Sequence, residues 1–241
     1  GWVGRRAMFE RLHHQRIAQV LQALDGPLLQ ANHCFFGGGT AIALVHGEYR
    51  ESVDIDFLVS DLACYRTLRQ LLTTAQGIAA IVREGAEPLQ QSREVRADQY
   101  GIRTTVQVAD QPIKLEIVLE ARIALALPGP RDAVCGIATL TPLDLAASKL
   151  LANSDRWADD GVFSRDLIDL AMMKPSFLLL QQAVAKAEQA YGKSVLQDLA
   201  KALHRLKTRD GWLERCMQAM AIHTPRALLW QRLKALERVL P

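Results

Sequence analysis

The hydrophobic pattern of the chain changes near residue 141, and this change limits the folds that the sequence can adopt. Before it, short apolar or alternating runs typical of β-strands occur at 34–36, 55–59, 78–82, 102–108 and 113–119. Helical spacing is found at 8–24, and helices are also expected at 40–47 and 61–76. Beyond residue 141 the strand pattern is absent. The sequence therefore predicts an α+β fold, in which a mixed β-sheet flanked by helices is followed by an all-α helical bundle.

The helical part begins with a clear start signal. Thr141 is suited to the N-cap, Pro142 to the first helical position and Asp144 to the first turn. Further starts at Ser164 and near residues 175, 194 and 225 predict a bundle of about five helices.

The length of 241 residues, with 49% hydrophobic residues, suffices for two domains. We expect an α/β domain at residues 1–140 and a helical domain at residues 141–241 that contributes to the active-site cleft.

The composition argues against a membrane protein and against a disulfide scaffold. No apolar run approaches the roughly 20 residues that span a bilayer, and no signal-peptide pattern opens the chain, so a cytoplasmic protein is expected. The net charge of +3 is compatible with an anionic substrate without identifying one. The cysteines lack a CxxC pair and the histidines lack partners at metal-ligand spacing, so free thiols and no cysteine-based zinc site are expected. These residues are Cys34, Cys64, Cys135, Cys216, His13, His14 and His33.

A glycine-rich turn follows the first predicted strand. Gly37, Gly38, Gly39 and Thr40 lie between the apolar pair Phe35-Phe36 and a short helix. Glycines allow the backbone to approach a phosphate closely, and the helix N-terminus offers unpaired N–H groups to an anion. Such a turn also occurs where only tight geometry is needed, so it does not by itself define a phosphate site.

Two aspartates alternate with apolar residues at the next predicted strand. Asp54 and Asp56 are two residues apart and therefore share one face, while Ile55 and Phe57 point to the other. Two carboxylates this close repel each other unless a cation lies between them, and oxygen ligands of this kind suit Mg²⁺. A polar strand face exposed to solvent is the simpler alternative.

A third carboxylate fits the same arrangement. Glu116 lies on the polar face of the predicted strand at 113–119, opposite the apolar side chains of that strand. If this strand pairs with the one at 55–59, Glu116 comes level with Asp54 and Asp56 and completes a two-metal cluster.

Together these motifs resemble the nucleotidyltransferase superfamily of the DNA polymerase β type, and more narrowly the AbiEii/AbiGii toxin family. The resemblance covers roughly residues 30–175 and includes a lysine on one helix, Lys149, and an aspartate early on the next, Asp166. Asp169, one turn later, is an alternative to Asp166. In this sequence Glu116 stands where many members have Asp, and the glycine motif ends in Thr40 where many relatives have Ser.

The resemblance implies a nucleotidyltransferase-type sheet domain and the transfer of a nucleoside monophosphate from a nucleoside triphosphate (ATP, GTP or CTP) to an acceptor hydroxyl. It also implies a role for each matching residue. Gly38, Gly39 and Thr40 would hold the triphosphate, and Arg50 and Ser52 would line the same pocket. Asp54, Asp56 and Glu116 would bind Mg²⁺ or Mn²⁺, with Glu116 as the alternative base. Lys149 would offset phosphate charge, and Asp166 would hold Lys149 or the nucleotide.

The acceptor and the biological partner stay open in the sequence. The family resemblance implies an RNA acceptor such as tRNA, or a protein side chain, within a toxin–antitoxin or phage-defence system that has a cognate antitoxin. A small-molecule acceptor such as an antibiotic, and a catalytically inactive nucleotide-binding protein, are the alternatives. Basic residues of the C-terminal part, such as Lys201, Arg205 and Arg209, suit a phosphate-binding surface or a solvated helix face equally well.

Overall fold

The computed structural model describes residues 8–241, and residues 1–7 of the predicted first domain lie outside the described residues. The α+β fold is as predicted. Its first part contains α1 (Leu12–Ala23), α2 (Gly26–Ala31), β1 (Phe35–Gly37), α3 (Gly38–Val45), β2 (Ile55–Val59), α4 (Leu62–Leu72), the 3-10 helix η1 (Gly77–Ile81), β3 (Gln90–Ala97), β4 (Gly101–Val108), β5 (Gln111–Leu119), β6 (Ala133–Val134) and β7 (Ile137–Ala138).

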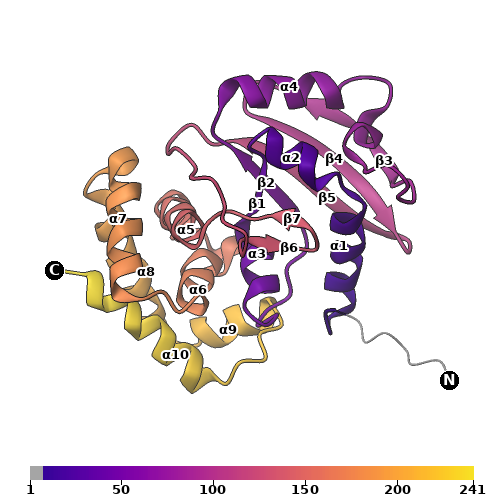
Figure 1. The fold of residues 1–241 in the computed structure, drawn as a ribbon. Coiled ribbons are helices and arrows are strands. Elements are labelled where there is room, and N and C mark those ends of the chain that lie inside the picture. The colour runs from indigo at the N-terminus through magenta and orange to yellow at the C-terminus, as the bar shows by residue number, and fades with distance from the viewer. Residues whose placement is uncertain (1–7) are drawn as a thin grey trace.

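The second part is helical. It contains α5 (Pro142–Arg156), the 3-10 helix η2 (Asp160–Val162), α6 (Arg165–Met172), α7 (Phe177–Tyr191), α8 (Ser194–Thr208), α9 (Trp212–Ala219), α10 (Arg226–Ala235) and the 3-10 helix η3 (Leu236–Val239). Figure 1 shows these helices gathered on one side of the sheet. The predicted start of α5 is confirmed, because Thr141 is the N-cap and accepts a hydrogen bond from the Asp144 N–H.

The main sheet has five strands in the order β1-β2-β5-β4-β3. The pair β2–β5 is parallel and the other neighbours are antiparallel, so the sheet is mixed. The parallel register sets Asp56 directly beside Glu116. Residues Ile55, Phe57 and Val59 of β2 are fully buried, so this face of the strand joins the core and the opposite face is free for polar side chains.

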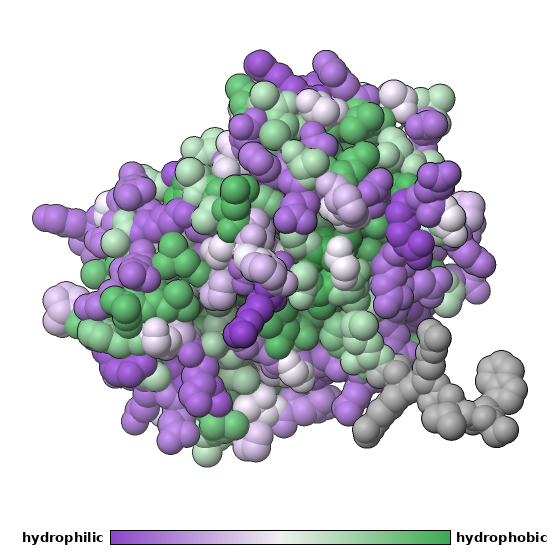
Figure 2. Space-filling model, in the orientation of Figure 1, coloured by the Kyte–Doolittle hydropathy of each residue, from purple (hydrophilic) through white to green (hydrophobic). Residues whose placement is uncertain are grey.

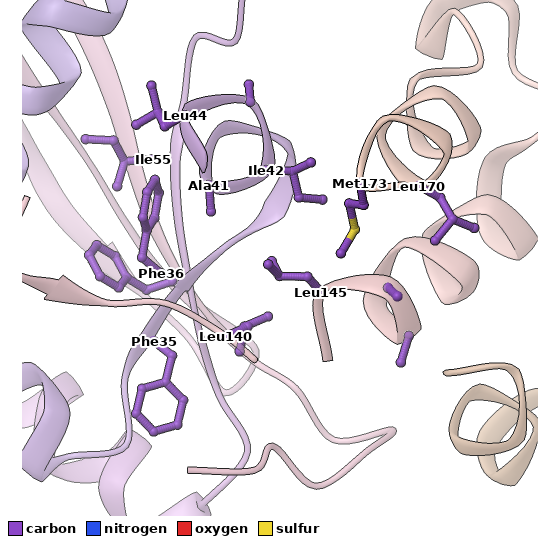
Figure 3. Packing of buried hydrophobic residues seen from close by; sticks show 14 of the residues in the cluster. Phe35, Phe36, Ala41, Ile42, Leu44, Ile55, Leu140, Leu145, Leu170 and Met173 are labelled. Carbon is purple, nitrogen blue, oxygen red and sulfur yellow. The ribbon is translucent and has the colours of Figure 1, made fainter. Parts of the chain in front are cut away.

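Helix α3 packs between the sheet and the helical part. It contacts β1 and β2 on one side and α5 and α6 on the other. In Figure 3 Ile42 of α3 points toward Met173 and Leu145 of the helical part, with Leu140 beneath them. The residues of this region form a single buried cluster that continues from the sheet into the helices. Helix α3 is therefore held rigidly where its N-terminus meets β1 and β2.

The surface is mixed in character. On the face in Figure 2, hydrophilic residues predominate along the rim, and hydrophobic residues gather in places toward the middle. No helix within residues 8–241 combines the length and the apolar character that crossing a membrane requires.

Three sequence predictions of secondary structure need correction. The predicted strand at 78–82 is the 3-10 helix η1, because its buried residues Ile78 and Ile81 follow a three-residue helical spacing, and Val82 forms only an isolated bridge to Leu24. Strand β3 was not predicted, since it is a largely exposed edge strand with polar residues on both faces. The described helical part has six α-helices instead of about five, because α9 follows Gly211 without a side-chain cap.

Candidate active site

A cavity of about 590 Å³ lies where β2, the N-terminus of α3 and helices α5 and α6 meet. All ten residues singled out for the site except Glu116 and Asp166 line this cavity. Glu116 is the register partner of Asp56, which does line the cavity, and Asp166 binds Lys149, which also lines it. The structure thus brings the sequence-predicted residues together in one region, although they come from segments more than 100 residues apart.

The glycine turn leaves no room for side chains. Gly38 has a φ of +68°, which L-residues with side chains rarely adopt, and a Cβ there would lie 3.1 Å from Asp56 Oδ2. A Cβ on Gly39 would lie 2.0 Å from the guanidinium nitrogen Nη2 of Arg50 and 2.8 Å from Asp169 Oδ2. The turn therefore brings the α3 backbone directly against charged groups of the cavity.

The hydroxyl of Thr40 is occupied within the protein. Thr40 is buried, its Oγ1 lies 2.6 Å from the Ser52 hydroxyl, and it donates a hydrogen bond to the carbonyl of Asp54. These bonds tie the start of α3 to the chain that leads into β2. Any contribution of Thr40 to triphosphate binding thus comes through its place in the turn.

His14 of α1 supports the same loop. Its Nε2 accepts a hydrogen bond from the backbone N–H of Ser52 at 3.0 Å, and its Nδ1 lies 2.9 Å from Glu48 Oε1. Because Nε2 is the acceptor, the ring proton is on Nδ1 and is donated to the carboxylate. Burial lowers the pKa of His14, which favours this neutral form. The histidine therefore has a structural role in supporting the loop.

The C-terminal part also contacts this loop. The backbone N–H of Glu51 donates to the Met220 carbonyl at 2.9 Å, just beyond α9. Arg11, before α1, donates to the Ala221 carbonyl at 2.7 Å and to the Glu48 carbonyl at 3.0 Å. The loop that precedes β2 is therefore held by the residue before α1 and by the segment just beyond α9.

The carboxylates of the site are close enough to affect one another. Asp54 immediately precedes β2, and Asp56 faces the same way and lies beside Glu116 of β5. Burial, with the charges of Asp54 and Glu116, raises the pKa of Asp56 to about 6. Glu116 also accepts a hydrogen bond from Arg103 Nε at 3.1 Å. The cluster of three acids leaves negative charge that its protein neighbours only partly offset.

A divalent cation fits this donor set. Carboxylate oxygens are the ligands that Mg²⁺ and Mn²⁺ prefer, and the raised pKa of Asp56 shows that its negative charge is destabilised in the protein alone. Asp54 and Asp56 would hold one ion, and Glu116, the register partner of Asp56, would contribute to holding a second.

Two cations of the cavity, one from the helical part and one from the loop before β2, bind aspartates of α6. Lys149 of α5 is buried, and its Nζ lies 3.0 Å from both Asp166 Oδ1 and Asp169 Oδ2 of α6. Arg50 binds both oxygens of Asp169, at 2.7 and 2.9 Å, and the Tyr49 hydroxyl donates to the same carboxylate. These cations hold the pKa of Asp166 and Asp169 below the usual range despite burial. Both of the aspartates that the sequence offered as alternatives therefore bind Lys149.

Two arginines of the cavity were missed by sequence reasoning. Arg156 donates to both oxygens of Asp166, at 2.6 and 2.8 Å, and Arg165 lines the cavity without an ion pair among the described residues. Burial and the charge of Arg156 lower the pKa of Arg165. Arg156 could have been found, because it lies seven residues after Lys149 and therefore on the same face of α5.

A second, larger groove of about 1320 Å³ begins at the same carboxylates. Asp54 lines both the cavity and the groove, and Glu116 lines the groove. The groove continues over the face of β3, β4 and β5, where its lining includes four basic residues. We call these residues, Arg93, Arg96, Arg103 and Lys114, the basic groove residues.

One further group of metal-ligating side chains lies outside the cavity. His33, Asp61 and Cys64 have ligand atoms within 4.8 Å of one another, and among the described residues they are the one group of three that meets this spacing. The carboxylates of Asp54, Asp56 and Glu116 are therefore more widely spaced. His33 has partners that its sequence spacing did not reveal, because β1 and the exit of β2 are antiparallel neighbours. All four cysteines are free thiols.

The buried ion pairs predict a large effect of Asp169→Asn on stability. The change leaves Arg50 and Lys149 with less opposing charge in a buried place, so the free energy of unfolding should fall by about 3–5 kcal/mol. Chemical denaturation measures this fall. Asp160→Asn is the matched control, because Asp160 also binds two arginines but is exposed, and it should lower the free energy of unfolding much less. Equal effects of the two changes would contradict the buried network.

The raised pKa of Asp56 predicts a pH-dependent stability difference. An acid whose pKa is higher in the folded state stabilises the fold below about pH 4 and loses this contribution as the pH rises through about 6. In EDTA at about pH 7, the free energy of unfolding of Asp56→Asn, measured with urea, should therefore exceed that of the wild type by roughly 1–3 kcal/mol. Near pH 4 the variant and the wild type should be equally stable. The exposed Asp210→Asn serves as control. A gain that is the same at both pH values would refute the explanation.

Comparison with known proteins identifies the family of the chain. Residues 20–236 match the family model described as nucleotidyl transferase AbiEii toxin, type IV TA system. The fold is similar to that of JHP933 from Helicobacter pylori, with a TM-score of 0.50, 18% identity, and coverage of 96% of this chain and 94% of that one. A crystal structure of a candidate nucleotidyltransferase from H. pylori gives a TM-score of 0.48 at 18% identity, over 95% of this chain and 94% of that one. No curated protein matches the chain. The chain therefore belongs to the AbiEii family of nucleotidyltransferase toxins and is a nucleotidyltransferase.

Proposed function

We propose that this nucleotidyltransferase moves a nucleoside monophosphate from a nucleoside triphosphate to an acceptor hydroxyl. The observation that carries the proposal is the opposition of charges across one cavity. Asp54 and Asp56 lie on the sheet side, and Lys149, Arg156 and Arg165 lie on the helical side. A triphosphate with its divalent cation complements both sides, since the cation meets the carboxylates and the phosphate oxygens meet the basic side chains.

The proposed reaction exchanges a phosphoanhydride bond of the triphosphate for a phosphodiester bond to the acceptor. The acceptor oxygen forms a bond to the α-phosphorus, the bond between this phosphorus and the oxygen bridging to the β-phosphorus breaks, and pyrophosphate leaves. The hydroxyl proton is taken up by a base, a role that we assign to Glu116 because it lines the groove and is the register partner of Asp56. The protein contributes position and charge more than covalent chemistry.

Mg²⁺ or Mn²⁺ bound by the three carboxylates would offset the charge that develops on the phosphate oxygens and lower the pKa of the attacking hydroxyl. On the opposite side, the positive charges of Lys149, Arg156 and Arg165 would offset the negative charge of the departing pyrophosphate. Asp166 and Asp169 fix Lys149 from two directions and therefore keep its ammonium group in one position.

An RNA acceptor accounts best for the groove. The groove opens at Asp54 and Glu116, so an acceptor lying in it would bring its end to the reacting phosphate. Among the described residues, Arg93, Arg96 and Lys114 of the groove make no ion pair and are exposed. Unpaired basic side chains along a groove suit the phosphates of a single strand. We propose RNA, tRNA included, over a protein side chain or an antibiotic for this reason.

The family to which the chain belongs implies a toxin role with a cognate antitoxin. A catalytically inactive nucleotide binder is the competing function. It is disfavoured because none of the residues assigned to the site is missing. Asp54, Asp56 and Lys149 line the cavity, Glu116 is the register partner of Asp56, and both aspartates of α6 bind Lys149.

The function is tested by radiolabel transfer. Purified protein, Mg²⁺ and each α-³²P-labelled nucleoside triphosphate are incubated with total RNA, with tRNA, and with cellular protein. Label is expected to enter RNA, and Asp54→Ala/Asp56→Ala should reduce transfer by at least about a hundredfold, because it removes charge stabilisation at the transferring phosphate. Arg69→Ala, on the exposed face of α4 and outside the cavity and the groove, should retain transfer.

Three outcomes would count against parts of the proposal. Binding of triphosphate with no product from any acceptor favours the inactive binder. Label in protein alone overturns the RNA acceptor. Undiminished transfer by the double aspartate variant overturns the assignment of the site.

The basic groove residues predict a salt-dependent contact. Arg93→Ala/Arg96→Ala should weaken RNA binding and reduce the slope of log affinity against log salt by about 1.5, since each neutralised phosphate contributes about 0.7 to 0.9 to the slope. Fluorescence anisotropy of a labelled RNA across a salt series measures both quantities. Arg66→Ala/Arg69→Ala removes the same charge from the exposed face of α4 and should leave the slope unchanged. Equal effects of the two pairs would locate binding outside the groove.

A further inference from the structure

One aromatic side chain lines the cavity among the described residues, that of Phe163. It is partly buried and lies between Gly161 and Arg165, which line the cavity as well. The next acid along the chain, Asp166, binds Lys149 and Arg156. The ring therefore lies near the cations proposed to hold phosphate. The roles proposed for the charged residues of the site do not include this ring.

The backbone around this ring is strained. Phe163 and Ser164 have φ values of +54° and +51°, so two consecutive non-glycine residues adopt the left-handed conformation. Such positions cost free energy and persist where the surroundings hold them, which is often at binding sites. Here the left-handed pair separates η2 from α6 and sets the position of the Phe163 ring at the cavity wall.

Trp212 of α9 provides that support. Its indole Nε1 donates a hydrogen bond to Ser164 Oγ at 2.9 Å, and its ring lies nearly parallel to that of Phe163, at 16° with centroids 6.1 Å apart. Arg205 and Arg209 pack on the Trp212 ring at 4.5 and 4.3 Å from its centroid, and both bind Asp160 in η2. The segment before α6 is thus attached to α8 and α9, and Phe163 presents a preformed apolar surface.

We propose that Phe163 is the stacking surface for the nucleobase of the donor triphosphate; the inference rests on the proposed function. A rigid aromatic ring beside a phosphate-binding cluster matches the two chemical ends of a nucleotide. Stacking uses the π-face that every base has, so the contact adds affinity for each of the four nucleoside triphosphates and selects among them weakly. Choice between bases then falls to polar groups of the cavity.

The test distinguishes the contribution of the base to binding affinity from the contribution of the phosphates. Binding of α,β-methylene nucleoside triphosphates, which cannot be cleaved between the α- and β-phosphorus, is compared with binding of inorganic tripolyphosphate, each with Mg²⁺, by calorimetry. Phe163→Leu should weaken binding of the nucleotides roughly 5- to 100-fold and leave tripolyphosphate binding within about twofold. Phe163→Trp should restore nucleotide affinity. Phe177→Leu, an exposed phenylalanine of α7, is the matched control and should bind as the wild type does.

Each other outcome overturns a defined statement. Unchanged nucleotide binding by Phe163→Leu overturns the stacking role. Equal weakening of nucleotide and tripolyphosphate, or no rescue by Phe163→Trp in a variant whose thermal unfolding is unchanged, shows that the residue shapes the loop only and also overturns it. A wild-type protein that binds tripolyphosphate but no nucleotide refutes the inference as well, whereas one that binds neither refutes the proposed function and the inference together.

Discussion

The site depends on the buried bonds between α6 and the basic residues around it. Asp169 has no exposed surface, and it holds Arg50 from the loop before β2 and Lys149 from α5 in one hydrogen-bonded group. A buried charge of either sign would be costly alone, so these residues require one another. Gly39 lets the turn approach this group, since a larger residue would collide with Arg50 and Asp169. The network thereby joins the sheet and the helical part at the place where the chemistry is proposed to occur.

The cavity has an acidic wall and a basic wall because the sheet and the helical part meet at it. The parallel pairing of β2 with β5 brings Asp56 beside Glu116, and the sheet side is acidic as a result. On the helical side Lys149 and Arg156 share Asp166, which leaves basic charge directed at the cavity. A cavity with one acidic and one basic wall favours a ligand that carries both a metal cation and phosphate groups, and disfavours a simple anion or a simple cation.

The sequence predicted the fold class, most strands and the residues that gather at the cavity, because these depend on local periodicity and on short motifs. It mispredicted 78–82, where apolar content was mistaken for strand pattern although the buried residues follow helical spacing. The pairing of Arg50 with Asp169 spans 119 residues and has no local signal, and the position of Phe163 depends on Trp212, which is also distant in sequence.

The bonds that hold the loop before β2 have a consequence for genetic variation in this protein. His14 of α1, which pairs with Glu48, braces the loop from one side, and the carbonyl of Met220 braces it from beyond α9. A change at such a remote residue would displace Asp54 without removing any group that meets the nucleotide. In a screen for non-toxic alleles, loss-of-function variants should therefore map to α1 and to the segment just beyond α9 as well as to the acidic and basic walls.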